Sequence, residues 1–179
     1  MSLILADTYK FCPQCGGALV KRLLKPGEPE RLVCSRCGFV FYLDPKLAVI
    51  AVVPLNGGVV MVRRSIDPGY GLWVAPGGFV DLGELVDEAV VRETWEEARL
   101  KVRVERLLNI YSYRDSATVV VAYLTKYLGG ELAAGDETLE AKVFTPAEIP
   151  WDQIPFRSTK AALHDYLKLT MKQNSCASG

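Results

Sequence analysis

The chain has 179 residues, half of them apolar and 23% charged, which is the composition of a globular protein with a buried core. Its 21 Lys and Arg balance its 21 Asp and Glu, and a net charge of zero argues against a whole-protein electrostatic grip on nucleic acid or an anionic membrane. The chain has one histidine, His164, which argues against a histidine metal site or a Ser-His-Asp triad. No apolar run approaches the roughly 20 residues of a membrane span. The start MSLILADTYK lacks a signal-peptide pattern, so we expect a cytoplasmic protein.

The first predicted module, residues 1–45, is defined by four of the five cysteines. They form two Cys-x-x-Cys pairs, each followed by glycine: Cys12 and Cys15, then Cys34 and Cys37. Two such pairs bring four thiolates to one ion, as in a tetrahedral zinc site. Short strands are expected at 18–24 and 31–33 around a Pro- and Gly-containing turn, so this module is predicted to be a zinc ribbon. Four cysteines close the coordination sphere, which favours a structural metal; two disulfides in an exported domain are the alternative.

Bases outnumber acids in the ribbon, which leaves a nucleic-acid-binding or protein-binding role open as an alternative. A solvated surface around a structural metal is the favoured interpretation, and a nucleic-acid partner is not expected. The fifth cysteine, Cys176, lies in the polar ending NSCASG and is expected to be a free, exposed thiol.

Residues 46–170 alternate β-rich segments with two helical patterns and predict a second domain, followed by a polar tail at 171–179. Asn56-Gly57-Gly58 is a strong hairpin signal. Strands are expected at 47–55, 59–63, 69–75, 101–113, 118–127 and 139–145, and helices at 85–98 and 158–171. A mixed sheet flanked by helices follows, which is α/β or α+β in class.

The first predicted helix carries an unusual concentration of acids. Residues 78–100 hold seven acids and two bases. At 100° per residue, Glu93, Glu96 and Glu97 share an arc of about 100°. Arg92, at i−4 from Glu96, relieves only part of their repulsion, so a divalent cation is favoured over a solvated, salt-bridged face. The core face is expected on the opposite side, at Val91, Trp95 and Ala98.

The stretch from Gly78 to Leu100 resembles the Nudix box, whose pattern is G x5 E x7 R E U x E E x G U. The matching fixed residues are Gly78, Glu84, Arg92, Glu93, Glu96 and Glu97. The cysteine module in front is similar to that of zinc-containing NADH pyrophosphatases and of related FAD or ADP-ribose pyrophosphatases. The resemblance implies a Nudix-type mixed β-sheet sandwiched between helices over residues 46–170, and a homodimer.

The resemblance also implies a reaction: water cleaves the diphosphate linkage of a small nucleoside diphosphate derivative, giving a nucleoside monophosphate and a phosphorylated product. It implies Mg²⁺ or Mn²⁺ ligands at Glu93, Glu96, Glu97 and the carbonyl of Gly78. Arg92 is then expected to orient a box carboxylate, with Glu84 as its partner or as an outer ligand. The water-activating base is a box glutamate or a loop carboxylate, Glu140 or Glu137; for Glu140 an ordinary surface acid is an equal alternative.

Substrate contacts are expected from basic and aromatic side chains near the box. Arg63 and Arg64 end a predicted strand and are candidates for phosphate contact, with a strand-end charge as the alternative. Aromatic rings can stack on a nucleobase, although aromatic residues in strands more often belong to a core. The candidates for stacking are Trp73, Phe79, Tyr111 and Tyr113.

Two departures from the family pattern bear on function. Thr94 replaces an aliphatic residue, and Arg99 replaces the glycine that supplies a left-handed helix C-cap. The SQPWPFPxS signature of NADH pyrophosphatases is missing after the box, so the substrate stays open among FAD, ADP-ribose and NADH. The alternative is a protein without catalysis: a nucleotide sensor or a zinc-ribbon binding module.

Overall fold

The computed structural model describes residues 8–176, with side chains described as far as Lys172. The described chain divides into two compact units, one running up to Lys46 with Tyr113–Ala117, and the other comprising Leu47–Ser112 and the chain from Thr118 onward. The sequence placed a boundary one residue earlier, after residue 45. Residues 1–7, on which the absence of a signal peptide was judged, lie outside the described part.

The first unit contains a small antiparallel sheet in the order β1-β2-β3. Its strands are β1 (Leu19–Arg22), β2 (Arg31–Cys34) and β3 (Val40–Phe41). The sequence predicted β1 and β2 within three residues at each end but missed β3, which has two residues and is too short to show an alternating pattern. The buried apolar residues here are few, namely Cys12, Leu32, Val33 and Cys34, so this core contributes little stability without a metal.

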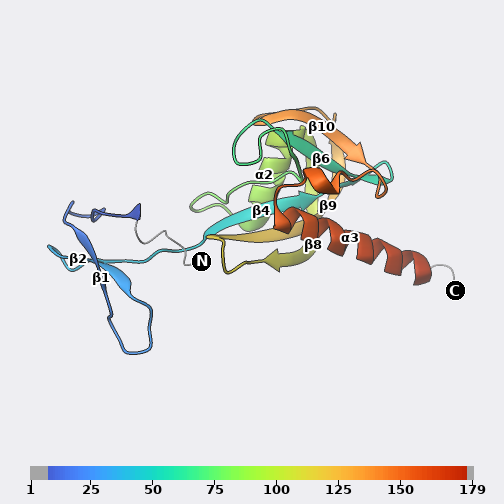
Figure 1. Ribbon diagram of the computed structural model, residues 1–179. Helices are drawn as coiled ribbons and strands as arrows, with labels where there is room; N and C mark the ends of the chain where they lie inside the picture. The colour runs from blue at the N-terminus through green and yellow to red at the C-terminus, as the bar shows by residue number, and fades with distance from the viewer. Residues whose placement is uncertain (1–7, 177–179) are drawn as a thin grey trace. The chain divides into compact units, whose positions relative to one another are not determined.

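The second unit is α+β and contains two sheets (Figure 1). One has the order β10-β6-β5 with β7 paired to β6, and the other has the order β4-β9-β8. The strands are β4 (Lys46–Val52), β5 (Pro54–Leu55), β6 (Gly58–Arg64), β7 (Trp73–Val74), β8 (Leu100–Tyr111), β9 (Thr118–Gly130) and β10 (Thr138–Phe144). The predicted fold class is confirmed, and the predicted hairpin turn joins β5 to β6, with positive φ at Asn56 and Gly57.

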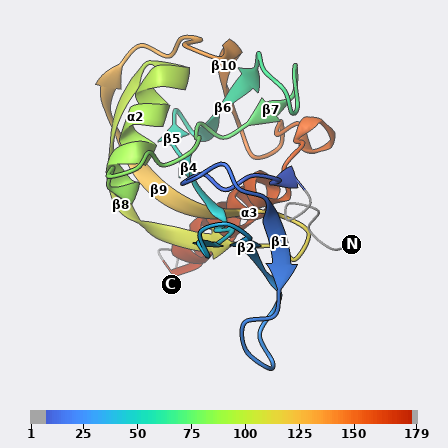
Figure 2. The same ribbon diagram turned by 90° about the vertical axis from the view of Figure 1, so that its left-hand side faces the viewer.

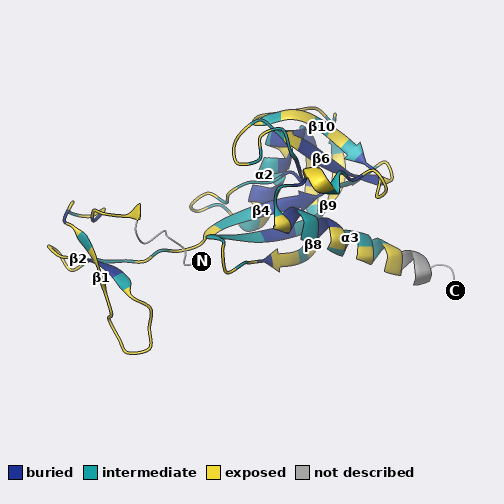
Figure 3. Ribbon diagram, in the orientation of Figure 1, coloured by how far each residue is buried: buried dark blue, intermediate teal, exposed yellow. Residues whose placement is uncertain are grey.

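Helix α2 (Val86–Ala98) contacts β8 of one sheet and β10 of the other (Figures 1 and 2). Its buried residues are Ala89, Val90, Thr94, Glu97 and Ala98. The predicted core face was therefore wrong for Trp95, which is 42% exposed, while Ala98 is buried and the partly buried Val91 packs against the core as expected. The prediction assumed that acids and core lie on opposite sides of the helix, but the buried side passes through Glu97. Buried residues are concentrated in β4, β6 and α2, and in β4 and β6 they follow one another along the strand (Figure 3).

Helix α3 (Arg157–Cys176) follows a 3₁₀ turn at Trp151–Gln153 and contacts β8 and β9. Its Asp165 accepts hydrogen bonds from Asn109 Nδ2 at 2.9 Å and from the Tyr111 hydroxyl at 2.8 Å, which fix the helix to β8. The helix continues past Met171, so the predicted tail at 171–179 is helical as far as its backbone is described. The side chain of Cys176 lies outside the described part. Within residues 8–176 no helix combines the length and apolarity needed to cross a membrane.

Candidate functional site

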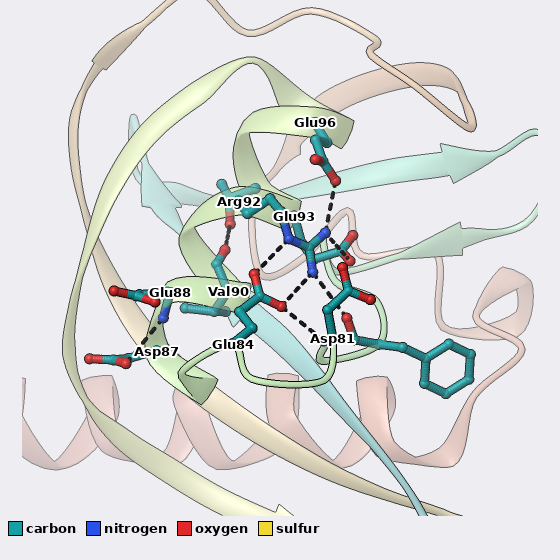
Figure 4. A network of polar contacts seen from close by, with 10 residues as sticks. Asp81, Glu84, Asp87, Glu88, Val90, Arg92, Glu93 and Glu96 are labelled. Atoms are coloured by element: carbon teal, nitrogen blue, oxygen red, sulfur yellow. Dashed lines mark hydrogen bonds and ion pairs between the residues drawn. The ribbon is translucent and has the colours of Figure 1, made fainter.

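The guanidinium of Arg92 lies at the centre of a carboxylate network on α2 (Figure 4). Its Nε and Nη2 donate to the two oxygens of Glu84 at 2.7 and 3.0 Å, which is a bidentate pair. Its Nη1 donates to Glu93 at 2.8 Å and to Glu96 at 2.9 Å, and Nη2 also donates to the carbonyl of Phe79 at 3.0 Å. These hydrogen bonds from Arg92, with one from the Asp81 amide, hold the pKa of Glu84 at about 2.

Glu97 is the acid that Arg92 does not reach. Its carboxylate is 6% exposed and accepts a hydrogen bond of 2.8 Å from the backbone N–H of Gly77. Burial raises the pKa of Glu97 to about 8, the amide of Gly77 opposes that shift, and the charge of Glu93 adds to it. Burial also raises the pKa of Glu93, against the hydrogen bond from Arg92. Glu97 is thus buried and Glu93 partly buried, and for both the cost of desolvation outweighs the contacts that stabilise the charge.

The glycine loop between β7 and α2 brings backbone close to these acids. The carbonyl of Gly78 accepts the N–H of Val49 at 2.8 Å, which ties the loop to β4. A Cβ added at Gly78 would overlap the carboxylate of Glu93, so any other residue here would displace that carboxylate. A carbonyl oxygen has a second lone pair, so that of Gly78 can also act as a metal ligand.

The two loop carboxylates considered as bases lie in different surroundings. Glu140 is half exposed and stands 4.0 Å from Arg63 across the β10–β6 pairing. Glu137 follows Asp136, whose backbone N–H donates to the carbonyl of Glu96, and its negative charge adds slightly to the raised pKa of Glu93 and Glu97. Glu140 faces an arginine on the neighbouring strand, and both residues stay candidates for the base.

The predicted substrate contacts separate into core and exposed residues. Trp73 is 7% exposed and packs edge-to-face on Phe144 with ring centroids 4.8 Å apart, and Tyr111 is 9% exposed with its hydroxyl bonded to Asp165. Both were named for base stacking with a core position as the alternative, and their burial agrees with the alternative. Phe79 is 51% exposed and follows the glycine loop directly, and its stacking role stays a prediction.

The two arginines at the end of β6 are held by backbone carbonyls. Arg64 Nε donates to the carbonyl of Pro68 at 2.8 Å, and its guanidinium lies 5.4 Å from the ring of Phe156. Its charge lowers the pKa of Glu97, which places Arg64 near that acid. Arg63 Nε donates to the carbonyl of Gly71 at 2.8 Å. Tyr113, the last stacking candidate, is half-buried and belongs to the other compact unit.

The four cysteines of the first unit gather at one point. All their sulfurs lie within 4.8 Å of one another, with Cys12 and Cys37 at 3.7 Å and Cys15 and Cys34 at 3.5 Å. Zn–S bonds of about 2.3 Å in a tetrahedron place sulfurs about 3.8 Å apart, so the set fits zinc. Hydrogen bonds from the N–H groups of Cys37 and then Arg36, against desolvation, lower the pKa of the Cys34 thiol to about 6 and favour the zinc-binding thiolate.

The two cysteine loops are built alike. The amide of Gly16 donates to the carbonyl of Cys12 at 2.9 Å, and the amide of Gly38 donates to that of Cys34 at 3.1 Å. Both glycines have positive φ, as the expected tight turns require. The cysteine spacing in the sequence therefore identified this cluster fully.

The acidic site is arranged differently from the cysteine cluster. Among the described side chains, the four cysteines form the one group of three or more His, Cys, Asp or Glu ligand atoms within mutual reach of a metal. The box carboxylates are instead hydrogen-bonded to the protein: Glu93 and Glu96 both accept from Nη1 of Arg92, and Glu97 accepts from the Gly77 amide. Their chemistry nevertheless fits Mg²⁺ or Mn²⁺, since these are hard oxygen donors with excess buried negative charge.

A glycine loop, an acidic helix packed between two sheets and an arginine that binds its carboxylates define the class of Nudix hydrolases. The family model of the NUDIX domain matches residues 44–166, and that of the Nudix N-terminal zinc ribbon matches residues 10–43. The chain belongs to the Nudix family. The expected enzyme class, a hydrolase of nucleoside diphosphate derivatives, is thereby confirmed.

Relatives in both sequence and structure carry this fold. An ADP-ribose pyrophosphatase of Methanocaldococcus jannaschii is 35% identical over 71% of this chain and 76% of its own length. An NAD-capped RNA hydrolase NudC of Chromobacterium violaceum is 29% identical over 74% of this chain, which spans only 48% of that relative. A NUDIX hydrolase of Nitrosomonas europaea has a crystal structure that superposes with a TM-score of 0.84 and 32% identity, covering 89% of this chain and 91% of that one.

Proposed function

We propose that this chain hydrolyses the diphosphate of an ADP-linked nucleoside diphosphate derivative, with ADP-ribose the first candidate and FAD and NADH the others. The observation that carries the proposal is the placement of the buried Glu97 and the partly buried Glu93 against the glycine loop, Glu97 on the Gly77 amide and Glu93 beside Gly78. The M. jannaschii relative named as an ADP-ribose pyrophosphatase supports the choice of the first candidate. With ADP-ribose the products would be AMP and ribose 5-phosphate.

We assign Mg²⁺ or Mn²⁺ binding to Glu93, Glu96, Glu97 and the free lone pair of the Gly78 carbonyl. When bound, such an ion neutralises the diphosphate and lowers the pKa of a water. Arg92 keeps the carboxylates of Glu93 and Glu96 oriented, because its guanidinium is itself fixed by the bidentate pair with Glu84.

The remaining steps fall to residues around the loop. Glu137 is assigned as the carboxylate that accepts the proton of the attacking water, in preference to Glu140, since its loop is hydrogen-bonded to the end of α2 at Glu96 and Glu97 while Glu140 faces Arg63. Arg64 is assigned to a phosphate oxygen, because it lies near Glu97 and is the cation held there by Pro68. The exposed ring of Phe79 is assigned to the nucleobase.

The deciding experiment offers ADP-ribose, FAD, NADH and an NAD-capped oligonucleotide to the full chain with Mg²⁺ or Mn²⁺. Phosphate released by a coupled phosphatase reports on each product. Highest turnover with ADP-ribose supports the first candidate, and highest turnover with another compound replaces it. Tight binding of one compound without product, measured by calorimetry, would instead make the protein a nucleotide sensor.

Four further expectations from the sequence also remain proposals. We propose that residues 1–45 and 46–170 are separate domains, that the four cysteines hold structural zinc, that the enzyme is cytoplasmic, and that it forms a homodimer. Metal analysis of the purified protein and sedimentation equilibrium test the zinc and the dimer. One zinc per chain and twice the 19.7 kDa chain mass are the expected results.

A further inference from the structure

Arg99, which stands where the family pattern has glycine, ends α2 in a strained conformation. Its φ of 57° and ψ of 23° are left-handed, and its own N–H caps the carbonyl of Trp95 at 3.0 Å. Left-handed backbone costs free energy for any residue with a Cβ, and glycine would avoid that cost. The arginine side chain is thus kept at a position where the backbone alone favours glycine.

That side chain binds the loop that follows β9. Arg99 Nη2 donates to Oδ1 of Asp136 at 2.9 Å. The same loop closes the end of α2 through its backbone: the amides of Ala133, Gly135 and Asp136 donate to the last three carbonyls of the helix at 3.2, 3.0 and 2.8 Å. Loop and helix end are therefore joined by three backbone hydrogen bonds and one ion pair.

The approach at Gly135 is close. A Cβ added there would overlap the carbonyl oxygen of Glu96 and would lie 3.0 Å from Nε of Arg99. The guanidinium stem therefore covers the backbone of Gly135 on its way to Asp136. The ion pair itself is exposed, with 72% of the Asp136 side chain and 35% of the Arg99 side chain accessible, so we expect it to contribute little to global stability and to act on the position of the loop.

The residue next along the loop is Glu137. Its backbone is also left-handed, with φ of 56°, and its carbonyl accepts the N–H of Ser65 at 2.9 Å, which ties it to the end of β6. Asp136 is therefore the link between the end of α2 on one side and Glu137 on the other. The acids Glu96 and Glu97 are the very residues whose carbonyls accept the loop amides.

We propose that Arg99 is a positioning residue, which through Asp136 sets the place of the Glu137 carboxylate relative to the acids of α2. The proposal rests on the proposed function only where it predicts turnover. Glycine at position 99 would relieve the strained backbone, but it would leave the loop held by its backbone hydrogen bonds alone.

The first test needs no substrate. Hydrogen exchange of the Gly135 and Asp136 amides is measured in the wild type, Arg99→Gly and Asp136→Asn. Both variants should exchange about threefold faster or more, as the loss of a surface ion pair allows. Arg106→Ala removes an exposed arginine of β8 and should leave these amides unchanged. Equal protection in all four proteins overturns the proposal whatever the protein hydrolyses.

The second test uses the compound that the wild type hydrolyses. Arg99→Gly should lower kcat about tenfold at unchanged KM, because a misplaced group weakens only the chemical step. Arg99→Lys should recover part of the loss. In a Glu137→Gln background, Arg99→Gly should cost nothing further, since its effect passes through that carboxylate. Asn56→Gly controls for relief of positive φ at a distant turn and should keep full kcat.

The two tests separate the two proposals. Full wild-type turnover with an unchanged kcat in Arg99→Gly overturns the positioning role and leaves the proposed function standing. Additive losses from Arg99→Gly and Glu137→Gln overturn it as well, because they place the effect of Arg99 elsewhere. A wild type without turnover contradicts the proposed function, while the exchange measurement still decides whether Arg99 holds the loop.

Discussion

The backbone N–H of Gly77 donates to Oε2 of Glu97 across 2.8 Å, so the glycine loop is hydrogen-bonded to the most buried acid of α2. One hydrogen bond from a neutral amide compensates only part of the cost of burying a carboxylate. The ionised carboxylate of Glu97 is thus only partly compensated by the protein, and it lies where the glycine loop meets α2.

Glu97→Gln should remove hydrolysis while preserving the fold. The amide keeps the size of the side chain and an oxygen for the Gly77 N–H, but it carries no charge for a divalent ion. We expect kcat to fall roughly 100-fold or more, as for removal of one transition-state electrostatic contact. The measurement is turnover at saturating Mn²⁺ together with far-ultraviolet circular dichroism. Turnover near the wild-type value with an intact spectrum would contradict the assignment.

The stability of the metal-free protein should fall as pH rises. The pKa of Glu97 is about 8 in the folded chain and near 4.5 when unfolded, so the unfolded chain loses its proton first. The contribution of the protonated Glu97 carboxyl to the free energy of unfolding is complete below about pH 4.5. It falls by about 1.4 kcal/mol per pH unit and is lost by about pH 8. Urea titrations in EDTA between pH 5 and 8 should show this loss as a decrease in the free energy of unfolding.

The control for this pH dependence is Glu97→Gln, which should show a flatter profile over the same range. Because EDTA also removes zinc, the wild type and Glu97→Gln are both treated with EDTA in the same way. Added Mg²⁺ or Mn²⁺ should raise the stability of the wild type most at pH 8, where the acid is charged. Parallel profiles for the two proteins would show that Glu97 does not cause the trend.

Much of this arrangement follows from local sequence. The spacing of Arg92 from Glu96 predicted their ion pair, and Asn56-Gly57 predicted the turn, because both features depend on residues a few positions apart. The side of α2 that faces the core depends on which distant strands pack against the helix, so the helical period alone misplaced Trp95. The contact between Arg99 and a loop 37 residues later left no local signal.

Arg92→Lys should destabilise the protein and disorganise the acids. A lysine keeps the charge but not the fork that contacts Glu84, Glu93 and Glu96 together. We expect a loss of about 1–3 kcal/mol, less than for a fully buried pair because the guanidinium is partly exposed. Thermal unfolding at pH 7 measures it, with Arg103→Lys on β8 as the matched surface control. A change no larger than that of the control would rule out a structural role for the fork.

Removal of zinc should unfold the first unit and spare the second. The ribbon has four buried apolar residues and two- to four-residue strands, so its folding free energy must come largely from metal–thiolate bonds. The second unit has its own core of Val49, Val60, Val90, Leu100 and their neighbours. We expect Cys34→Ser to lose zinc and the amide dispersion of residues 10–43 in a ¹⁵N spectrum, while resonances of β4, β6 and α2 keep their positions.

The same comparison distinguishes a structural zinc from a disulfide framework. Wild-type protein treated with a strong zinc chelator under reducing conditions should lose the same resonances as Cys34→Ser and recover them when zinc returns. Ser35→Ala, whose hydroxyl donates to the carbonyl of Ala18 at 3.1 Å beside the cluster, serves as the matched control and should retain zinc. If the ribbon resonances survive chelation in both proteins, the metal does not hold this unit together, because four cysteine sulfurs within 4.8 Å would then be stabilised by the protein alone.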